Sequence, residues 1–274
     1  MTSPILLTGG TGTLGRLVLP LLRETGRPVR VLSRSVHEAA DGVEYVRSVH
    51  EAADGVEYVA GDLATGDGIS TAVTGVETVL HCAGSAKGDE QKARTLVHAA
   101  KTAGVGHLVD ISVVGADRIP VRSGIDRALF GYFAAQLGTE RVIAESGIPW
   151  TTLRATQFHD FVLNAAQQAT RLPVAMSFAG VRFQPVDAAE VAERLVELAL
   201  GEPAGLVPDL AGPEVHDMKY LLRSYLEAAH KRRLIVPVRP PGAAGKAFRA
   251  GANLAPDRAV GRRTWEDFLS DRVG

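Results

Sequence analysis

The chain has 274 residues, of which 46% are hydrophobic and 22% charged, as is typical of a soluble globular protein with a large core. Its 30 basic and 31 acidic residues leave a net charge of −1, which provides no overall field to attract nucleic acid or an anionic membrane. The single cysteine, Cys82, excludes an intramolecular disulfide framework, and no apolar run approaches the roughly 18 residues of a membrane-spanning helix. No signal-peptide pattern precedes Thr8, so we expect a cytoplasmic protein.

The first predicted elements are a strand, a glycine-rich turn and a helix. Residues 4–7 form an apolar run of strand length, and the leucines from Leu14 onward recur at helical spacing. Between them, Gly9, Gly12 and Gly15 permit a tight turn, close approach of a diphosphate, and close packing of helix on strand. Because a helix N-terminus presents unpaired N–H groups, this turn predicts a dinucleotide site, the alternative being a purely structural turn.

Residues 29–32 read as a second strand, which completes a β-α-β unit. In a dinucleotide-binding fold an acidic residue after this strand favours NAD, whereas an arginine accommodates the 2′-phosphate of NADP. The chain has Ser33 and Arg34 here and no acid. We therefore predict NADP as the cofactor, with NAD possible; the alternative is that Arg34 is only a solubilising surface charge.

An exact tandem duplication follows, since residues 34–46 and 47–59 both read RSVHEAADGVEYV. Two copies are too few for a solenoid. Each copy begins with a Ser-x-x-Glu capping-box pattern and ends with a strand-like Val-Glu-Tyr-Val. Because residues 56–59 join directly to the turn at Gly61, we predict that the second copy forms the third strand. The first copy is expected to be extruded beside the adenosine pocket as an extended helix or a surface loop. The alternative is that this insert has no function at all.

Strands and helices then alternate. Strands are expected at residues 78–84, 107–112 and 150–154, and helices at 90–102 and 125–145. This alternation predicts an α/β fold with a doubly wound parallel sheet of Rossmann type, whose ligand lies at the carboxyl ends of the strands. Because the alternation loosens after Arg154, we expect residues 1–154 to form the NAD(P)-binding core and 155–274 a smaller, mixed α/β substrate lobe of the same domain.

The C-terminal part is predicted more coarsely. Asp187-x-x-Glu190 is a capping-box pattern at the start of an apolar helix that ends near Leu200, and a second helix is expected at residues 217–230. Residues 206–212 read as strand or loop. The basic residues between 231 and 263 could form a nucleic-acid patch, but few aromatic residues for base stacking accompany them, so a solvated surface with flexible turns is favoured.

Several of these motifs together resemble the short-chain dehydrogenase/reductase superfamily, and within it the atypical NmrA-like branch of NADP(H)-binding proteins. The resemblance covers nearly the whole chain except the duplicated segment. It is carried by GGTGTLG at residues 9–15, VLSR at 31–34, GDL at 61–63, Ala83-Gly84, ISVVG at 111–115 and LRATQF at 153–158.

The resemblance implies a cofactor site and a substrate pocket, with no metal. Gln157 and Phe158 would lie at the mouth of the substrate pocket, although Phe158 could equally belong to the core. His159 is expected to be a surface or packed histidine rather than a catalytic one, because the sequence offers it no evident partner. The residues expected to contact the cofactor are Gly9, Thr11, Gly12, Thr13, Leu14, Gly15, Arg34, Asp62, Leu63, Ala83, Gly84 and Gln136.

In active members of the superfamily a Tyr-x-x-x-Lys pair works with a serine. Tyr132 and Gln136 hold the matching positions here, so glutamine replaces the lysine, and Ser112 is the candidate serine. The spacing places Tyr132 and Gln136 on one helix face. Without a cation to favour the tyrosinate, the phenol is a poor general base, but it can still donate a hydrogen bond to a developing oxyanion, as can Ser112. Purely structural roles for both residues are the alternative.

Two functions are consistent with these residues. One is an NADP(H)-dependent oxidoreductase that transfers hydride to a small apolar carbonyl, enone or quinone, since the cofactor carries the hard chemical step. The other is a non-catalytic, NADP(H)-binding redox sensor or regulatory protein, which the missing lysine favours. In both cases the expected partners are small molecules rather than nucleic acid or a membrane.

Overall fold

The computed structural model describes residues 3–34, 50–51, 55–84 and 88–273. The chain divides into two compact units. Unit 1 comprises Met1–Ile111, Ala135–Leu153 and Ala192–Val207, and unit 2 comprises Ser112–Ala134, Arg154–Val191 and Pro208–Gly274. The division at residue 154 within one domain therefore stays a prediction. None of the helices in the described ranges is both long enough and apolar enough to cross a membrane.

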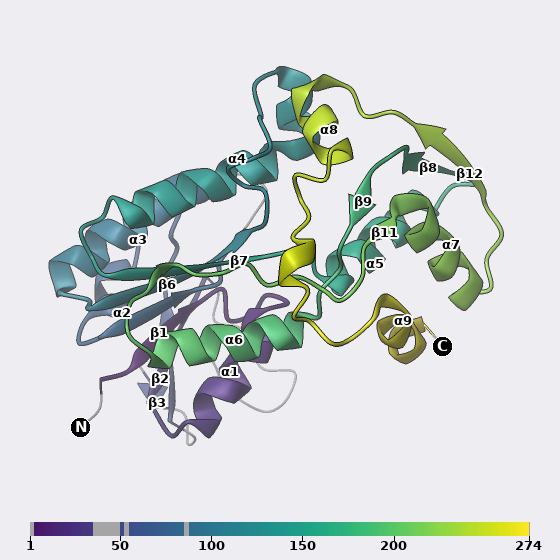
Figure 1. Ribbon diagram of the computed structural model, residues 1–274. Helices are drawn as coiled ribbons and strands as arrows, with labels where there is room; N and C mark the ends of the chain where they lie inside the picture. Colours follow the sequence, from purple (N-terminus) through teal and green to yellow (C-terminus); the bar gives the residue numbers. More distant parts are fainter. Residues whose placement is uncertain (1–2, 35–49, 52–54, 85–87, 274) are drawn as a thin grey trace. The chain divides into compact units, whose positions relative to one another are not determined.

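Within the described ranges, unit 1 is built on an eight-stranded sheet in the order β10-β7-β6-β5-β1-β2-β4-β3 (Figure 1). β1 pairs in parallel with β2 on one side and β5 on the other, so the strand order reverses beside β1. In a doubly wound fold the ligand binds at such a reversal. The strands are β1 Ile5–Thr8, β2 Val29–Ser33, β3 His50–Glu51, β4 Val56–Ala60, β5 Thr78–His81, β6 His107–Val113, β7 Trp150–Ala155 and β10 Gly205–Leu206.

Helices cover both faces of this sheet, with α1 and α3 on opposite sides in Figure 1. The predicted Rossmann-type α/β fold is thus confirmed. α3 ends at Gly104, whose φ of 73° is the left-handed conformation that terminates many helices. The helices that run wholly or partly through unit 1 are α1 Gly15–Glu24, α2 Ile69–Val73, α3 Asp89–Ala103, α4 Gly124–Ala144 and α6 Ala188–Leu200.

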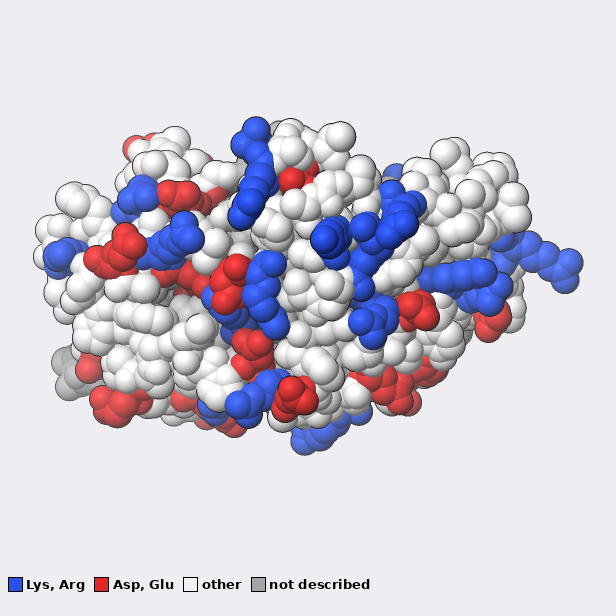
Figure 2. Space-filling view, turned by 45° about the horizontal axis from the view of Figure 1, so that its top comes forward, with Lys and Arg blue, Asp and Glu red and all other residues white. Residues whose placement is uncertain are grey.

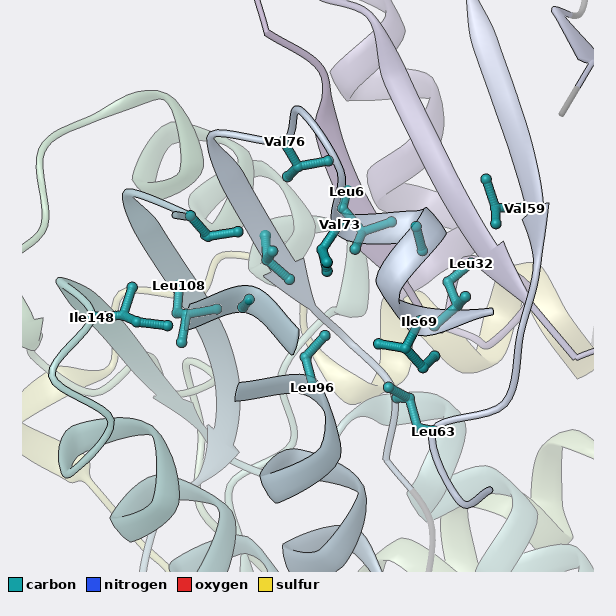
Figure 3. Packing of buried hydrophobic residues seen from close by; sticks show 14 of the residues in the cluster. Leu6, Leu32, Val59, Leu63, Ile69, Val73, Val76, Leu96, Leu108 and Ile148 are labelled. Atoms are coloured by element: carbon teal, nitrogen blue, oxygen red, sulfur yellow. The ribbon is translucent and has the colours of Figure 1, made fainter. Parts of the chain in front are cut away.

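The core of unit 1 lies between the sheet and the helices α2 and α3. Leu6, Leu32 and Val59 from neighbouring strands pack against Ile69 of α2 and Leu96 of α3 (Figure 3). Each of these side chains is at most 7% exposed, and burying one leucine or isoleucine contributes about 2 kcal/mol. Every residue of β1 is buried, which explains why the central strands read as continuous apolar runs.

The second copy of the duplication supplies the edge of the sheet. β4 pairs in parallel with β2, from Val29 opposite Val56 to Ser33 opposite Ala60, which confirms the predicted third strand. The capping-box prediction for this copy was wrong, because Glu51 lies in β3 and pairs antiparallel with β4. The open edge of β4 offers backbone hydrogen bonds that outweigh a local cap. The first copy lies outside the described residues, apart from Arg34.

Unit 2 contains two small sheets and a helical layer. β8 pairs in parallel with β12, and β9 pairs antiparallel with β11. Leu221, Leu222, Tyr225 and Leu226 of α7 are buried together with Trp265 and Phe268 of α9. The elements are α5 His159–Ala169, β8 Val174–Phe178, β9 Arg182–Phe183, β11 His216–Asp217, α7 Met218–Ala228, β12 Leu234–Val238, α8 Gly242–Arg249, the short 3-10 helix Pro256–Arg258 and α9 Trp265–Val273.

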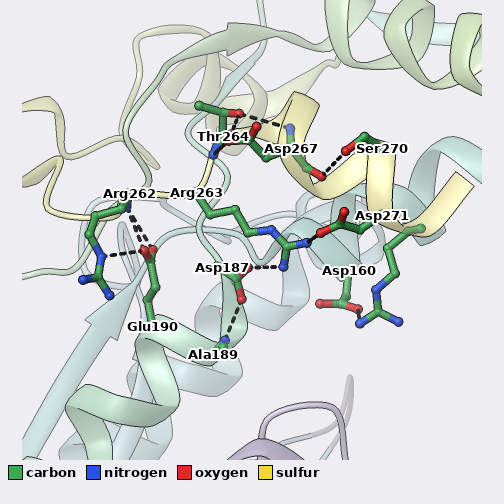
Figure 4. Close-up of polar contacts among 11 residues, drawn as sticks. Asp160, Asp187, Ala189, Glu190, Arg262, Arg263, Thr264, Asp267, Ser270 and Asp271 are labelled. Carbon is green, nitrogen blue, oxygen red and sulfur yellow. Dashed lines mark hydrogen bonds and ion pairs between the residues drawn. The ribbon is translucent and has the colours of Figure 1, made fainter. Parts of the chain in front are cut away.

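The C-terminal segment from residue 231 onward contains β12, α8, a short 3-10 helix and α9, which corrects the expectation of flexible turns. The Nη1 of Arg263 donates to the Oδ2 of Asp187 at 2.6 Å, and the backbone N–H of Arg262 donates to Glu190 at 2.9 Å (Figure 4). Asp187 also caps α6, because its Oδ1 accepts the N–H of Ala189 at 2.8 Å. The predicted helix is present, but Glu190 holds Arg262 instead of closing a capping box. On the face shown in Figure 2, basic and acidic side chains are interspersed.

Candidate functional site

The glycine turn after β1 is closed by backbone packing that admits no side chains. The N–H of Gly12 donates to the carbonyl of Gly9 at 2.9 Å, and Gly9 has a φ of 72°. A Cβ atom on Gly9 would lie 2.7 Å from the backbone nitrogen of Ala83, and one on Gly15 would overlap the carbonyl oxygen of Gly9. Glycine is therefore required at both positions for the turn to form and for α1 to pack against β1.

The outer side of the turn is open. Thr11, Gly12 and Thr13 are exposed, and α1 begins at Gly15. The N–H groups of Gly12, Arg16 and Leu17 already donate to carbonyls of the turn, so the donors that this exposed surface offers a diphosphate are those of residues 13–15 at the helix start. The turn therefore fits the predicted dinucleotide. Leu14 is only 6% exposed, so its backbone alone could face a cofactor.

The loop after β5 lies against the same turn. The N–H of Cys82 donates to the carbonyl of Thr8 at 3.1 Å, which places the backbone of Ala83 beside Gly9. A Cβ on Gly84 would lie 3.6 Å from the Nε2 of Gln136, so the side chain of Gln136 reaches this loop from α4. The structure thus brings together four of the predicted cofactor-binding residues, which are Gly9, Ala83, Gly84 and Gln136. Their contacts with a bound cofactor stay predictions.

Buried ionisable groups lie next to this loop. The Nδ1 of His81 is 2.7 Å from the Oγ1 of Thr8, and burial lowers the pKa of His81 to about 4. Burial also raises the pKa of the Cys82 thiol. Asp110 of β6 lies opposite His81 of β5 in the strand register, and its Oδ2 has no hydrogen-bond partner among the described residues. Burial, then the carboxylates of Glu140 and Asp89, raise the pKa of Asp110 well above its usual value.

At neutral pH His81 and Cys82 are therefore uncharged, and burial favours the protonated, neutral form of Asp110. Because this region is shielded from water, electrostatic interactions made in it are less screened than in water. Sequence reasoning missed Asp110. The signal for it was a single carboxylate inside the apolar run of residues 107–112, because charged residues are rare in buried strands.

The residues predicted to contact the adenosine follow two neighbouring strands. Arg34 is exposed directly after β2, and the N–H of Gly61 donates to the carbonyl of Ser33 at 2.9 Å, which joins the ends of β2 and β4. The Oδ1 of Asp62 accepts the N–H of Ala64 at 2.8 Å and shapes the turn. Leu63 is part of the core of unit 1, so it has a structural role whether or not it also touches adenine.

The catalytic candidates Ser112 and Tyr132 both belong to unit 2, on β6 and α4. Ser112 is 4% exposed near the end of β6, and Tyr132 of α4 is 44% exposed, with its ring centroid 5.9 Å from that of Phe133. Gln136 follows Tyr132 by one helical turn and is 4% exposed. The side chain of Gln136 is therefore shielded from water, whereas the phenol of Tyr132 is accessible. The catalytic roles of Tyr132 and Ser112 stay predictions.

The residues after β7 include a buried amide with a free donor. Gln157 is 8% exposed, and its Oε1 accepts a hydrogen bond from the Nδ2 of Asn253 at 3.4 Å. Its Nε2 has no partner within the described ranges, which suits a group that awaits an acceptor on a ligand. Phe158 is half-buried at the start of α5, so both readings of it stay open. Asn253 was missed because the tail was interpreted as solvated surface.

His159 is a packed residue, in line with the expectation. It is completely buried, and its ring centroid lies 5.0 Å from that of Phe268 and 6.0 Å from that of Trp265. Neither ring nitrogen has a hydrogen-bond partner in the part of the chain that the structure describes. Burial lowers the pKa of His159 to about 4, so the ring is neutral at physiological pH.

Comparison with known proteins agrees with this fold. Residues 9–201 match the family model described as NAD(P)H-binding. The chain is 28% identical over 239 residues to quinone oxidoreductase 2 of Escherichia coli, which covers 83% of this chain and 75% of that protein. It is 29% identical over 166 residues to (4-alkanoyl-5-oxo-2,5-dihydrofuran-3-yl)methyl phosphate reductase of Streptomyces griseus subsp. griseus, which covers 59% of this chain and only half of that protein.

A solved structure gives the same fold. The NADPH complex of the quinone oxidoreductase QOR2 from Escherichia coli superposes with a TM-score of 0.77 at 22% identity, covering 97% of this chain and 99% of that one. The family match spans more than half of the chain and begins at Gly9, the first residue of the glycine turn. The predicted cofactor class is thereby confirmed. The chain belongs to the NAD(P)H-binding family, within the atypical short-chain dehydrogenases/reductases, and NAD(P)H is its cofactor.

Proposed function

We propose that the chain is an NADP(H)-dependent oxidoreductase that transfers hydride to a small apolar quinone, enone or carbonyl compound. The observation that carries this proposal is the open glycine turn at the start of α1, with Ala83, Gly84 and Gln136 gathered beside it. Arg34, exposed after β2, supports NADP(H) over NAD(H) because a guanidinium can pair with the 2′-phosphate.

The relatives support the class of acceptor. One is a quinone oxidoreductase, and the other reduces an acyl-substituted, unsaturated lactone, so the names of both describe conjugated acceptors. A conjugated acceptor spreads the charge that arrives with the hydride and therefore needs less acid catalysis than an isolated ketone. This suits a site in which Gln136 replaces the lysine that would activate Tyr132.

Bound NAD(P)H supplies the hydride, and the side chains of the chain provide orientation and hydrogen-bond donors. The amide of Gln136 can hold a ribose hydroxyl near Gly84. The hydroxyls of Tyr132 and Ser112 can donate to the oxygen that gains charge, and removal of one preorganised donor of this kind costs about 3 kcal/mol of transition-state stabilisation. The free amide donor of Gln157 can orient the acceptor.

A second function, a nucleotide-binding redox sensor without turnover, is favoured by one observation. The position of the usual lysine holds Gln136, which is 4% exposed and carries no charge to lower the pKa of a neighbouring phenol. Such a protein would keep the glycine turn and lose the reaction.

The two functions are separated by measuring NADPH oxidation at 340 nm with a panel of quinones and enones. For a reductase, wild type turns over, Tyr132→Phe and Ser112→Ala each lower kcat by about a hundredfold, and Leu129→Ala on the same helix surface leaves it unchanged. Binding of NADPH without turnover of any acceptor would establish the sensor instead. Alcohol oxidation that appears only in Gln136→Lys would identify a former dehydrogenase and contradict the proposed reductase.

A further inference from the structure

A cluster of metal-ligating side chains lies in unit 2, on elements that the proposed reaction does not use. Glu214 precedes β11, His216 lies in β11, and Glu266 lies in the first turn of α9. One ligand atom from each of these three side chains falls within 4.8 Å of the other two. We propose that Glu214, His216 and Glu266 bind one divalent first-row transition metal ion, of which Zn²⁺ is the best match.

The contact between His216 and Glu214 has the geometry of two ligands. The Nε2 of His216 is 3.3 Å from the Oε2 of Glu214, yet within the described part of the chain this buried nitrogen makes no hydrogen bond. A buried polar atom left without a partner costs about 1–3 kcal/mol. In a tetrahedral Zn²⁺ site with bonds of about 2.0–2.1 Å, two ligand atoms lie roughly 3.3 Å apart. Both atoms can therefore reach a common cation with little movement.

Neighbouring residues hold the ligands in position. His216 is in register with Phe183 in the β9–β11 pair, which fixes its backbone. Its ring stacks on that of Tyr220, with centroids 4.8 Å apart and planes 12° apart. The hydroxyl of Tyr220 donates to the Oε1 of Glu266 at 2.7 Å and leaves the second carboxylate oxygen for a metal. One tyrosine thus orients two of the three ligands, as the residues that support metal ligands commonly do.

The donor set selects the class of metal. One imidazole nitrogen with two carboxylate oxygens suits Zn²⁺, whereas Ca²⁺ and Mg²⁺ prefer oxygen ligands only. A simple ion pair would explain the cluster less well, because Glu214 and Glu266 are exposed and such surface pairs contribute about 0–1 kcal/mol. A bound ion would link β11 to the C-terminal helix α9, so its expected role is to stabilise the fold of unit 2.

The test is calorimetric titration of the metal-free, full-length chain with ZnCl₂, with thermal unfolding as a second readout. We expect one Zn²⁺ to bind with a micromolar dissociation constant and to raise the Tm. Glu266→Gln and His216→Ala should each weaken this binding at least tenfold, and Tyr220→Phe should weaken it about tenfold through loss of ligand orientation. His98→Gln, which removes an exposed histidine of α3, is the matched control and should bind as wild type does.

Two results would overturn the metal site. One is wild-type protein that binds no Zn²⁺ at a dissociation constant below about 100 µM; the other is equal binding by wild type and Glu266→Gln, a substitution of an exposed residue that the fold should tolerate. Co²⁺ gives an independent spectroscopic readout, since tetrahedral coordination produces strong visible absorption that His216→Ala should abolish. None of these measurements depends on NADPH or on turnover.

Discussion

Replacement of the buried His159 by phenylalanine should make the protein less sensitive to acid. The ring is completely buried against Phe268 and Trp265, and neither of its nitrogens is hydrogen-bonded within the described residues. Burial lowers its pKa from 6.5 to about 4. Between these two values the unfolded chain binds a proton that the folded chain does not, so stability falls as the pH falls through this window and is unaffected above it.

The magnitude follows from the size of the pKa shift. A change from 6.5 to about 4, at about 1.4 kcal/mol per pH unit, corresponds to about 3 kcal/mol of stability lost by pH 4. His159→Phe removes this loss. At pH 8 the variant should also be about 1 kcal/mol more stable than wild type, because an aromatic hydrocarbon replaces a polar ring that lacks partners. His81, buried in unit 1 with a pKa also lowered to about 4, keeps part of the acid sensitivity in both proteins.

The assay is urea unfolding at pH 8, 6 and 4.5, followed by tryptophan fluorescence, for which Trp265 is a reporter beside the substituted ring. The difference in unfolding free energy between variant and wild type should widen by about 2.5 kcal/mol from pH 8 to pH 4.5. The exposed His98→Gln variant should follow wild type at each pH. A constant difference between His159→Phe and wild type across this range would refute the reasoning.

Three further outcomes concern the ion pair of unit 2 and the adenosine end of the site. Asp187→Ala should lower the unfolding free energy in urea by about 2 kcal/mol, because it removes the cap of Ala189 and the 2.6 Å pair with Arg263; an unchanged midpoint would contradict this. Arg34→Ala should reduce the preference for NADPH over NADH about tenfold in calorimetric titrations, and an unaltered ratio would remove Arg34 from the site. Deletion of residues 34–46 places the identical Arg47 after Ser33, so the NADPH dissociation constant should stay within about twofold; a large rise would assign the first copy a function.

The sheet of unit 1 was predictable because its signals are local. Strands such as Ile5–Thr8 are buried on both faces and therefore read as short apolar runs, and the glycines that follow have the spacing of a dinucleotide-binding turn. The position of the second copy of the duplication followed from chain connectivity alone. Local patterns do not show which distant residues come together. Gly84 and Gln136, which are far apart in the sequence, could therefore be assigned to one site only through the family resemblance.

The helix expected at residues 217–230 is present as α7, but β8, β12 and α9 of unit 2 escaped prediction because their partners are distant in the chain. β8 and β12 lie about 60 residues apart in the chain. The large apolar residues Val174, Met176 and Leu234 of this pair are exposed, so the hydrophobic pattern of the sequence does not mark the buried face. In α9, Trp265 and Phe268 are buried among charged neighbours, which hid the helix in a segment interpreted as solvated. Local patterns cannot report such long-range packing.

The most direct test of dinucleotide binding at the glycine turn is calorimetric titration of NADPH into wild type, Gly12→Ala and Gly106→Ala. A Cβ on Gly12 would lie 3.2 Å from the carbonyl oxygen of Gly9, on the exposed part of the turn, whereas one on Gly106 would make an ordinary 3.7 Å contact away from it. We predict micromolar binding to wild type and to Gly106→Ala, and at least tenfold weaker binding to Gly12→Ala. Folded wild-type protein that takes up neither NADPH nor NADH, or a Gly12→Ala variant that binds as tightly as wild type, would contradict the assignment.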